Sequence, residues 1–87
     1  MRVVSQHGNV DLPYERTVIC HGENSVIARC DGNEYVLGMY SSKRNTYRAM
    51  EMLRTEYGNY KQAKSSEYYF AFNYPKVFRF PLDSEVE

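Results

Sequence analysis

Three cations gather where a helix is predicted to begin: Lys43, Arg44 and Arg48 follow directly on Tyr40 and Ser42. A helix N-terminus has unpaired N–H groups and about half a positive charge, and it attracts anions. Natural helices usually place Asp or Glu there, so cations indicate that a partner supplies the negative charge. The serine hydroxyl, free amides and cations would hold a phosphate, and the tyrosine ring would stack on a base. The alternative is a solvated basic surface beside an ordinary serine cap.

A second group of residues could add aromatic and cationic contacts. Arg79 lies between Phe78 and Phe80. If both phenylalanines face a core, Arg79 projects from the opposite face of its strand, where it suits stacking or phosphate recognition. A charge that protects an edge strand from aggregation has the same sequence signature. Tyr14 is a further candidate for stacking on a base. The predicted ligand-binding residues are therefore Tyr14, Tyr40, Ser42, Lys43, Arg44, Arg48 and Arg79.

Residue types that bind metals or act as nucleophiles are few. Cys20 and His21 are neighbours, so on a strand they point to opposite faces and cannot easily share one ion. The spacings C-x-x-C and H-x-x-x-H are absent. His7 and His21 are the only imidazoles, and no G-x-S-x-G motif accompanies them. The sequence therefore predicts no metal site, no cofactor and no catalytic residues, and it favours a protein that is not an enzyme.

Charge and cysteine content limit the class of protein. Eleven basic and eleven acidic side chains balance, which argues against a nucleic-acid polymer as the partner. Two cysteines are too few for a secreted disulfide scaffold, and the first residues do not resemble a signal peptide. No stretch approaches the ~20 apolar residues of a membrane span. We therefore expect a cytoplasmic protein that does not bind membranes.

The chain is short and rich in tyrosine. Its 87 residues predict a single domain, 1–87, with a small core. Small cores often need a partner subunit, and the nine tyrosines suit half-buried and interface positions. We therefore expect a homo-oligomer, with the aromatic residues 68–74 or 77–80 at or near its interface.

The strongest strand signal is a β-hairpin. Asp-Gly at 31–32 predicts a tight turn between strands at 25–30 and 34–40. Arg29 then faces Glu34, so opposite charges meet across the ladder. The full predicted register pairs Cys30 with Asn33, Arg29 with Glu34, Ala28 with Tyr35 and Ile27 with Val36. Further strands are expected at residues 2–6, at 10–15 on an edge because of Pro13, at 17–21, at 68–74 and at 77–80.

One segment has the period of a helix. Thr46, Met50, Leu53 and Tyr57 recur at spacings of four, three and four, and Gly58 follows. These residues predict a helix at about 43–57, capped by Ser41 or Ser42. The expected architecture is α+β, an antiparallel sheet with this helix packed on one face. The acidic tail, 83–87, is expected to be frayed.

Three segments together resemble small uncharacterised proteins from phages and prophages of Gram-positive bacteria. The first is Arg-Val-Val-Ser-Gln at 2–6, followed by Gly8 and by Asp-Leu-Pro-Tyr-Glu at 11–15. The others are Ala-Met-Glu-Met-Leu-Arg at 49–54 and Phe-Arg-Phe-Pro at 78–81. They occur in the same order and cover about a quarter to a third of the chain.

The resemblance implies a phage origin and expression in the host bacterial cytoplasm, without an assigned activity. Small phage proteins include compact oligomers that sequester the nucleotide signals of bacterial immunity. By analogy of class, the chain is expected to sequester a nucleotide-type small molecule, such as a cyclic ADP-ribose variant or a cyclic dinucleotide, and so to counteract anti-phage defence. Two alternatives stay open. One is a protein-binding inhibitor or adaptor that uses its aromatic sheet face or an edge strand; the other is an enzyme that degrades the same nucleotides.

Overall fold

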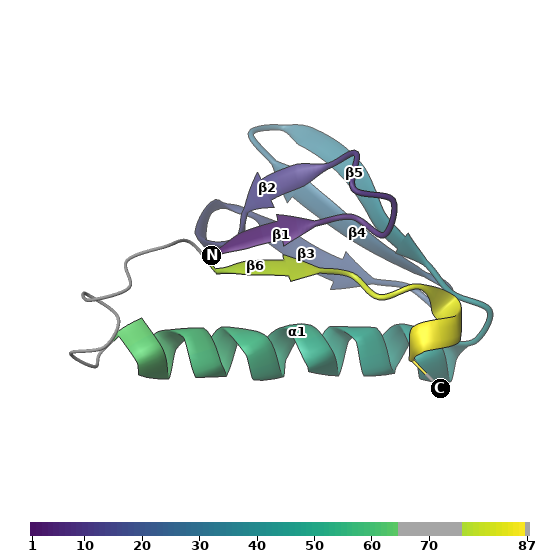
Figure 1. Cartoon of the computed structure of the whole chain (residues 1–87). Helices are drawn as coiled ribbons and strands as arrows, with labels where there is room; N and C mark the ends of the chain where they lie inside the picture. The colour runs from purple at the N-terminus through teal and green to yellow at the C-terminus, as the bar shows by residue number, and fades with distance from the viewer. Residues whose placement is uncertain (65–75, 87) are drawn as a thin grey trace.

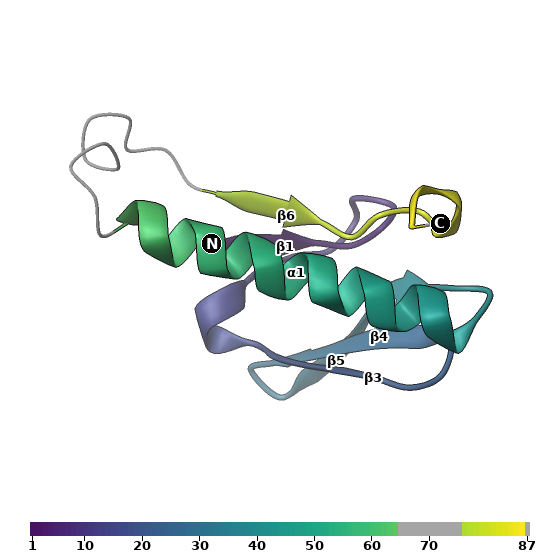
Figure 2. The ribbon, with the colours of Figure 1, turned by 90° about the horizontal axis from the view of Figure 1, so that it is seen from below.

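The computed structural model describes residues 1–64 and 76–86 and has an α+β fold, as predicted. Two three-stranded sheets pack with one long helix, α1 (Lys43–Lys64) (Figure 1). One sheet consists, in order, of β2 (Asp11–Pro13), β1 (Arg2–Val4) and β6 (Val77–Arg79). The other consists of β3 (Val18–His21), β4 (Ser25–Cys30) and β5 (Asn33–Met39). Figure 2 shows α1 running along the line between the two sheets.

The β4–β5 hairpin has the register that the sequence predicts, from the pair Cys30–Asn33 to the pair Ile27–Val36. Asp31 and Gly32 form its turn with φ values of 52° and 82°, the left-handed conformations that a two-residue hairpin turn requires. The Arg29 guanidinium lies 3.1 Å from the Glu34 carboxylate. Turn chemistry and cross-strand pairing therefore agree, and they fix which side chains face the helix: Val26, Ala28 and Leu37 are buried.

The strands form two sheets instead of the one antiparallel sheet that we expected, and in one of them β1 pairs with β6 in parallel. Val3 lies opposite Leu12 of β2 on one side and opposite Phe78 of β6 on the other. The chain crosses through α1 between β5 and β6, so the last strand returns in the same direction as the first. Gln6 joins the two sheets: its amide N–H donates to the Leu37 carbonyl at 2.8 Å, and its side chain bonds both main-chain groups of Met39.

Helix α1 is longer than predicted and passes through Gly58 without ending. A glycine inside a helix costs about 1 kcal/mol relative to alanine, which does not stop a helix that gains packing further on. Tyr60, one turn beyond Tyr57, packs against the core, and the two ring centroids lie 6.0 Å apart. This contact stabilises the part of the helix that follows Gly58.

The core lies between α1 and the inner faces of both sheets. Phe78 and Phe80 point to the same side of the β6 segment, and their rings meet edge to face with centroids 5.2 Å apart. Phe80 is 1% exposed and Leu53 of the helix is also 1% exposed. Fully buried side chains come from every layer of the fold: Val3, Val26, Leu37, Thr46, Leu53, Phe80 and Val86.

The acidic tail is not frayed over residues 83–86, which corrects our expectation. Residues Asp83–Glu85 form a 3₁₀ turn, and the Glu85 carboxylate accepts a hydrogen bond of 2.7 Å from the Leu82 amide. Val86 is 2% exposed, so an apolar side chain anchors this segment to the core. A second 3₁₀ turn covers Tyr14–Arg16. The predicted strand at 68–74 lies outside the described residues.

Candidate functional site

The start of α1 already has an anionic partner from the same chain. Asp83 Oδ1 accepts hydrogen bonds from the Ser41 amide and from the Asn45 side chain, each at 3.0 Å. Ser42 is the cap, because its hydroxyl oxygen accepts a hydrogen bond from the Asn45 amide at 3.1 Å. These bonds lower the pKa of Asp83 below its ordinary value near 3.8. The negative charge that the sequence seemed to lack therefore comes from 42 residues further along the chain.

Replacing Asp83 with Asn tests this contact. The folded-state pKa lies below the unfolded value, so the stabilisation is complete above the unfolded pKa and is lost as pH falls through the folded-state pKa. We expect Asp83→Asn to lower the midpoint of thermal unfolding at pH 7, with a difference from wild type that shrinks below about pH 4. Circular dichroism melts at several pH values measure it. Asp11→Asn removes an exposed ion pair with Arg2 and should change little. An Asp83→Asn effect that is the same at pH 2 and pH 7 would contradict the charge contribution.

Tyr40, the predicted stacking residue, is a core residue in this fold. Its side chain is only 5% exposed, and its hydroxyl donates a hydrogen bond of 2.8 Å to the Pro81 carbonyl. Burial raises the pKa of Tyr40 to about 12. The ring therefore has no free face on which a base could stack, and it links β5 to the C-terminal segment instead.

The three cations of the predicted cradle remain accessible. Lys43, Arg44 and Arg48 are all exposed. Within residues 1–64 and 76–86, none of these side chains has an ion-pair or hydrogen-bond partner. The basic surface is therefore present, but the amide of Ser41 beside it is committed to Asp83.

Arg79 and Tyr14, the other two predicted residues, do not lie together. The guanidinium of Arg79 donates to the Gln6 carbonyl at 2.9 and 3.2 Å, so it fastens the loop after β1. Tyr14 packs on Tyr57 with ring centroids 4.3 Å apart, in a separate hollow of about 500 Å³ that Arg54 also lines. Burial and the neighbouring Tyr57 raise the pKa of Tyr14.

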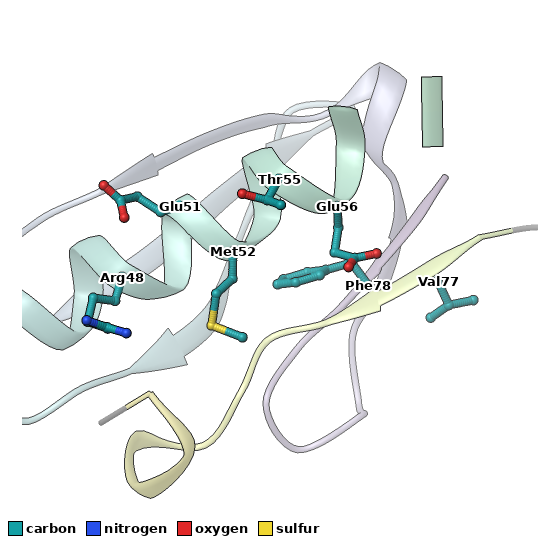
Figure 3. Close-up of a pocket in the computed structure, with 7 residues that line it drawn as sticks. All are labelled: Arg48, Glu51, Met52, Thr55, Glu56, Val77 and Phe78. Carbon is teal, nitrogen blue, oxygen red and sulfur yellow. The ribbon is translucent and has the colours of Figure 1, made fainter. Parts of the chain in front are cut away.

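A groove of about 460 Å³ runs between α1 and β6 (Figure 3). Arg48, Met52 and Glu56 follow each other at helical spacings of four and line its helix side, while Val77 and Phe78 line the strand side. In Figure 3 the side chain of Met52 and the ring of Phe78 lie between the helix and the strand. The groove thus has an apolar floor with charged groups along its rim.

A second hollow of about 630 Å³ adjoins the groove, because Met52 lines both. It lies against the loop after β1 and the C-terminal segment, and Arg79 and Leu82 are part of its lining. Two predicted residues, Arg48 and Arg79, therefore border neighbouring hollows on one surface. We call the two hollows together the α1–β6 groove.

The charges of the groove are unequal. Glu56 forms an ion pair of 2.9 Å with Lys76, so its charge is compensated. Figure 3 shows the Glu51 side chain directed away from β6. Arg48 has no such partner in the described part of the chain. An incoming group with a carboxylate or another anion would complement it.

The sequence argument missed the apolar residues of this groove. Met52, Val77 and Leu82 are 41%, 52% and 45% exposed, which is unusual for large apolar side chains on one surface. A signal for Met52 was present, because it lies off the apolar stripe of the helix that Met50 and Leu53 belong to. An apolar residue outside the stripe does not face the core, so its position predicts that Met52 lies on the surface of the helix.

Across the described residues, no three His, Cys, Asp or Glu side chains lie close enough together to hold a metal ion. Nor does the described part contain a helix of the length and apolarity that crossing a membrane needs. Comparison of the chain with protein-family models, with characterised proteins and with solved structures finds no match.

Proposed function

We propose that this chain is a non-enzymatic protein-binding domain that docks on a partner segment through the α1–β6 groove. The observation that supports it is the exposed apolar floor around Met52 beside Arg48, whose charge has no partner among the described residues. Interfaces gain most of their affinity from a few apolar anchors and arginines surrounded by a polar rim. The partner segment would carry an apolar side chain for the floor and a carboxylate for Arg48.

The shape of the groove favours a protein over a small molecule. Small-molecule sites are concave and surround most of the ligand, whereas the two hollows of this groove are only partly enclosed. Its residues span α1, β6 and the C-terminal segment, a surface suited to an extended or helical segment. On the resemblance to phage proteins, the domain would act as an inhibitor or adaptor of a host or phage protein in an infected bacterium.

Placing a charge on the groove floor should abolish docking. Met52→Glu puts a carboxylate where an apolar side chain would bind, and we expect it to lower partner retention at least about tenfold, or 1.4 kcal/mol. Met39→Glu is the matched control, because Met39 is a methionine of 59% exposure on β5, outside the groove. The measurement is affinity capture from bacterial lysate with quantitative mass spectrometry.

The pattern across variants decides the outcome. A protein retained by wild type and Met39→Glu but lost by Met52→Glu would support the proposal. Equal retention by all three would contradict the groove as the docking site. A wild-type domain that retains no protein would contradict the function itself.

Sequestration of a nucleotide signal is the second candidate, and the exposed cations Lys43, Arg44 and Arg48 favour it. Because the Ser41 amide beside these side chains donates to Asp83, that amide would not contact the phosphates, and the three cationic side chains would hold them. Calorimetry against cyclic ADP-ribose variants and cyclic dinucleotides tests it, with a Kd below about 10 µM, near −7 kcal/mol, as the criterion. Binding lost in a Lys43→Ala/Arg44→Ala variant and kept in Met52→Glu would favour sequestration. Release of altered nucleotide on denaturation would instead favour the degrading enzyme.

A further inference from the structure

The edges of the two sheets are unequally protected, and among the described residues one edge strand has neither a charged residue nor a proline nor a covering hydrogen bond. Natural sheets blunt their edges with charges, prolines, short strands or covering groups, because an open edge pairs with other chains. At one edge β2 has three residues and contains Pro13, which lacks an N–H; at another, β6 has Arg79 as well as Lys76 beside it. The main chain of β5 is covered at Leu37 and Met39 by Gln6.

Strand β3 is the exception. Its sequence, Val-Ile-Cys-His, has no lysine, arginine, carboxylate or proline, and among the described residues it pairs only with β4. Val18 is 65% exposed and Cys20 is also exposed. In Figure 2 the strand lies near the lower margin of the molecule. An apolar, uncharged edge of this kind is a template for another strand.

The ladder fixes which main-chain groups of β3 are free. The Gly22 amide donates to the Ser25 carbonyl at 3.0 Å, so this pair is hydrogen-bonded. Pairs alternate along an antiparallel ladder, so Cys20–Ile27 is a hydrogen-bonded pair as well. The N–H and C=O groups of Ile19 and His21 therefore point away from β4, toward the open edge.

We propose that β3 pairs with β3 of a second copy of this chain, antiparallel about a two-fold axis at Cys20. Ile19 then pairs with His21 of the other copy and the reverse, so every outward N–H and C=O group of both strands is used. A two-fold at Ile19 would need the Thr17 amide, which already donates to the Tyr14 carbonyl at 3.1 Å. A two-fold at His21 would pair Ile19 with Glu23, which lies beyond the strand.

Side chains on the outer face agree with this axis. Cys20, Ile27 and Val36 lie opposite one another on the three strands and form one cross-strand row. The two-fold joins this row to its copy and makes an apolar band across a continuous six-stranded sheet, which favours self-association over a polar partner. The new interface is independent of the α1–β6 groove. It also replaces the predicted interface at 77–80, since Phe78 and Phe80 are buried within one copy.

The register places the two Cys20 residues directly opposite each other in a non-hydrogen-bonded pair. Their Cα atoms would be about 4.5 Å apart, inside the range of about 4.4–6.8 Å that a disulfide spans. Oxidation with diamide, a diazene, therefore tests the register. The two thiols lose two electrons and two protons and form one disulfide, and diamide takes up these electrons and protons and becomes a hydrazine. Cys30 is buried, and a Cys30→Ser background removes it from the reaction.

The control moves the thiol by two positions on the same strand. In a Val18→Cys/Cys20→Ser/Cys30→Ser variant the cysteine again replaces an exposed residue of β3, yet in the proposed register it faces position 22 of the other copy. At 100 µM protein we expect Cys30→Ser to form a covalent dimer at least about tenfold faster than this control, because opposed thiols have an effective concentration in the millimolar range. Non-reducing gels follow the reaction. Equal rates would overturn the register.

Light scattering tests the assembly without chemistry. Wild type should be a dimer at about 100 µM, and Cys20→Lys, which sets two charges against each other at the axis, should be a monomer of unchanged circular dichroism. Val36→Lys is the matched control, because Val36 belongs to the same row but lies on β5, away from the proposed interface. This variant should stay dimeric. A monomeric wild type, or a dimer that survives Cys20→Lys, would overturn the proposal. If Cys20→Lys does not fold, the cross-linking rates decide.

Discussion

Phe80→Ala should destabilise the domain by about 3–5 kcal/mol, the usual cost of removing a buried aromatic ring. Phe80 is 1% exposed and meets Phe78 edge to face. Removing its ring therefore leaves a cavity where the β6 segment faces the helix. A chain of 87 residues has a free energy of unfolding of about 4–13 kcal/mol, so the loss is a large part of the total. Urea unfolding followed by circular dichroism measures it.

Leu82→Ala is the comparison for Phe80→Ala. Leu82 belongs to the same C-terminal segment but is 45% exposed, and its truncation should change the free energy of unfolding by less than about 0.5 kcal/mol. Similar losses for the two variants would mean that the segment is not packed as described. If Phe80→Ala is unfolded without urea, Phe80→Leu should show a smaller loss in the same direction.

Gly38→Ala should also be strongly destabilising, by about 1–3 kcal/mol, because the new methyl group overpacks the core. A Cβ at position 38 would lie 2.8 Å from Cε2 of the Tyr40 ring and 3.0 Å from its hydroxyl. The ring cannot turn away cheaply, because it is buried and its hydroxyl is bonded to the Pro81 carbonyl. Moving it would loosen the link between β5 and the C-terminal segment.

Replacing Gly58 with alanine should have the opposite effect on the free energy of unfolding. Gly58 lies inside α1, is exposed, and would place its Cβ in open space, so Gly58→Ala should stabilise by about 0.5–1 kcal/mol. Thermal and urea unfolding of the two variants give the comparison. A neutral Gly38→Ala would show that Tyr40 is less constrained than its contacts indicate. A destabilising Gly58→Ala would count against a continuous helix.

The features that the sequence predicted are those that depend on near neighbours. The hairpin register follows from two turn residues and an Arg29–Glu34 pair five positions apart. The start of the helix follows from Ser42 and an apolar stripe. Its end was misplaced because Gly58 is a local stop signal, while the packing of Tyr60 that overrides it is tertiary. Strand periodicity shows which residues are buried but not which strands pair, so one sheet was expected where two exist.

The candidate site was only partly predictable for the same reason. Arg48 was identified as an exposed cation next to the helix start, and it borders the groove. The groove itself depends on β6 and residues 80–85 lying beside α1, which no short-range pattern reports. Asp83 reaches Ser41 across 42 residues, and Tyr40 is buried by Pro81 from 41 residues away. These contacts place Tyr40 and Ser41 in an internal hydrogen-bond network, while the cations of the predicted phosphate site stay exposed.

The parallel pairing of β1 with β6 governs the order in which the molecule can assemble. The β3–β4–β5 meander closes short loops, whereas Arg2 meets Val77 only when a loop of 75 residues is closed. The entropic cost of closing a loop rises with the logarithm of its length, so closing this loop costs about 2–3 kcal/mol more free energy than closing a hairpin. The β1–β6 pair is therefore a late event that relies on the meander and helix as a template. Until then Val3, at the centre of its sheet, has only β2 for a neighbour.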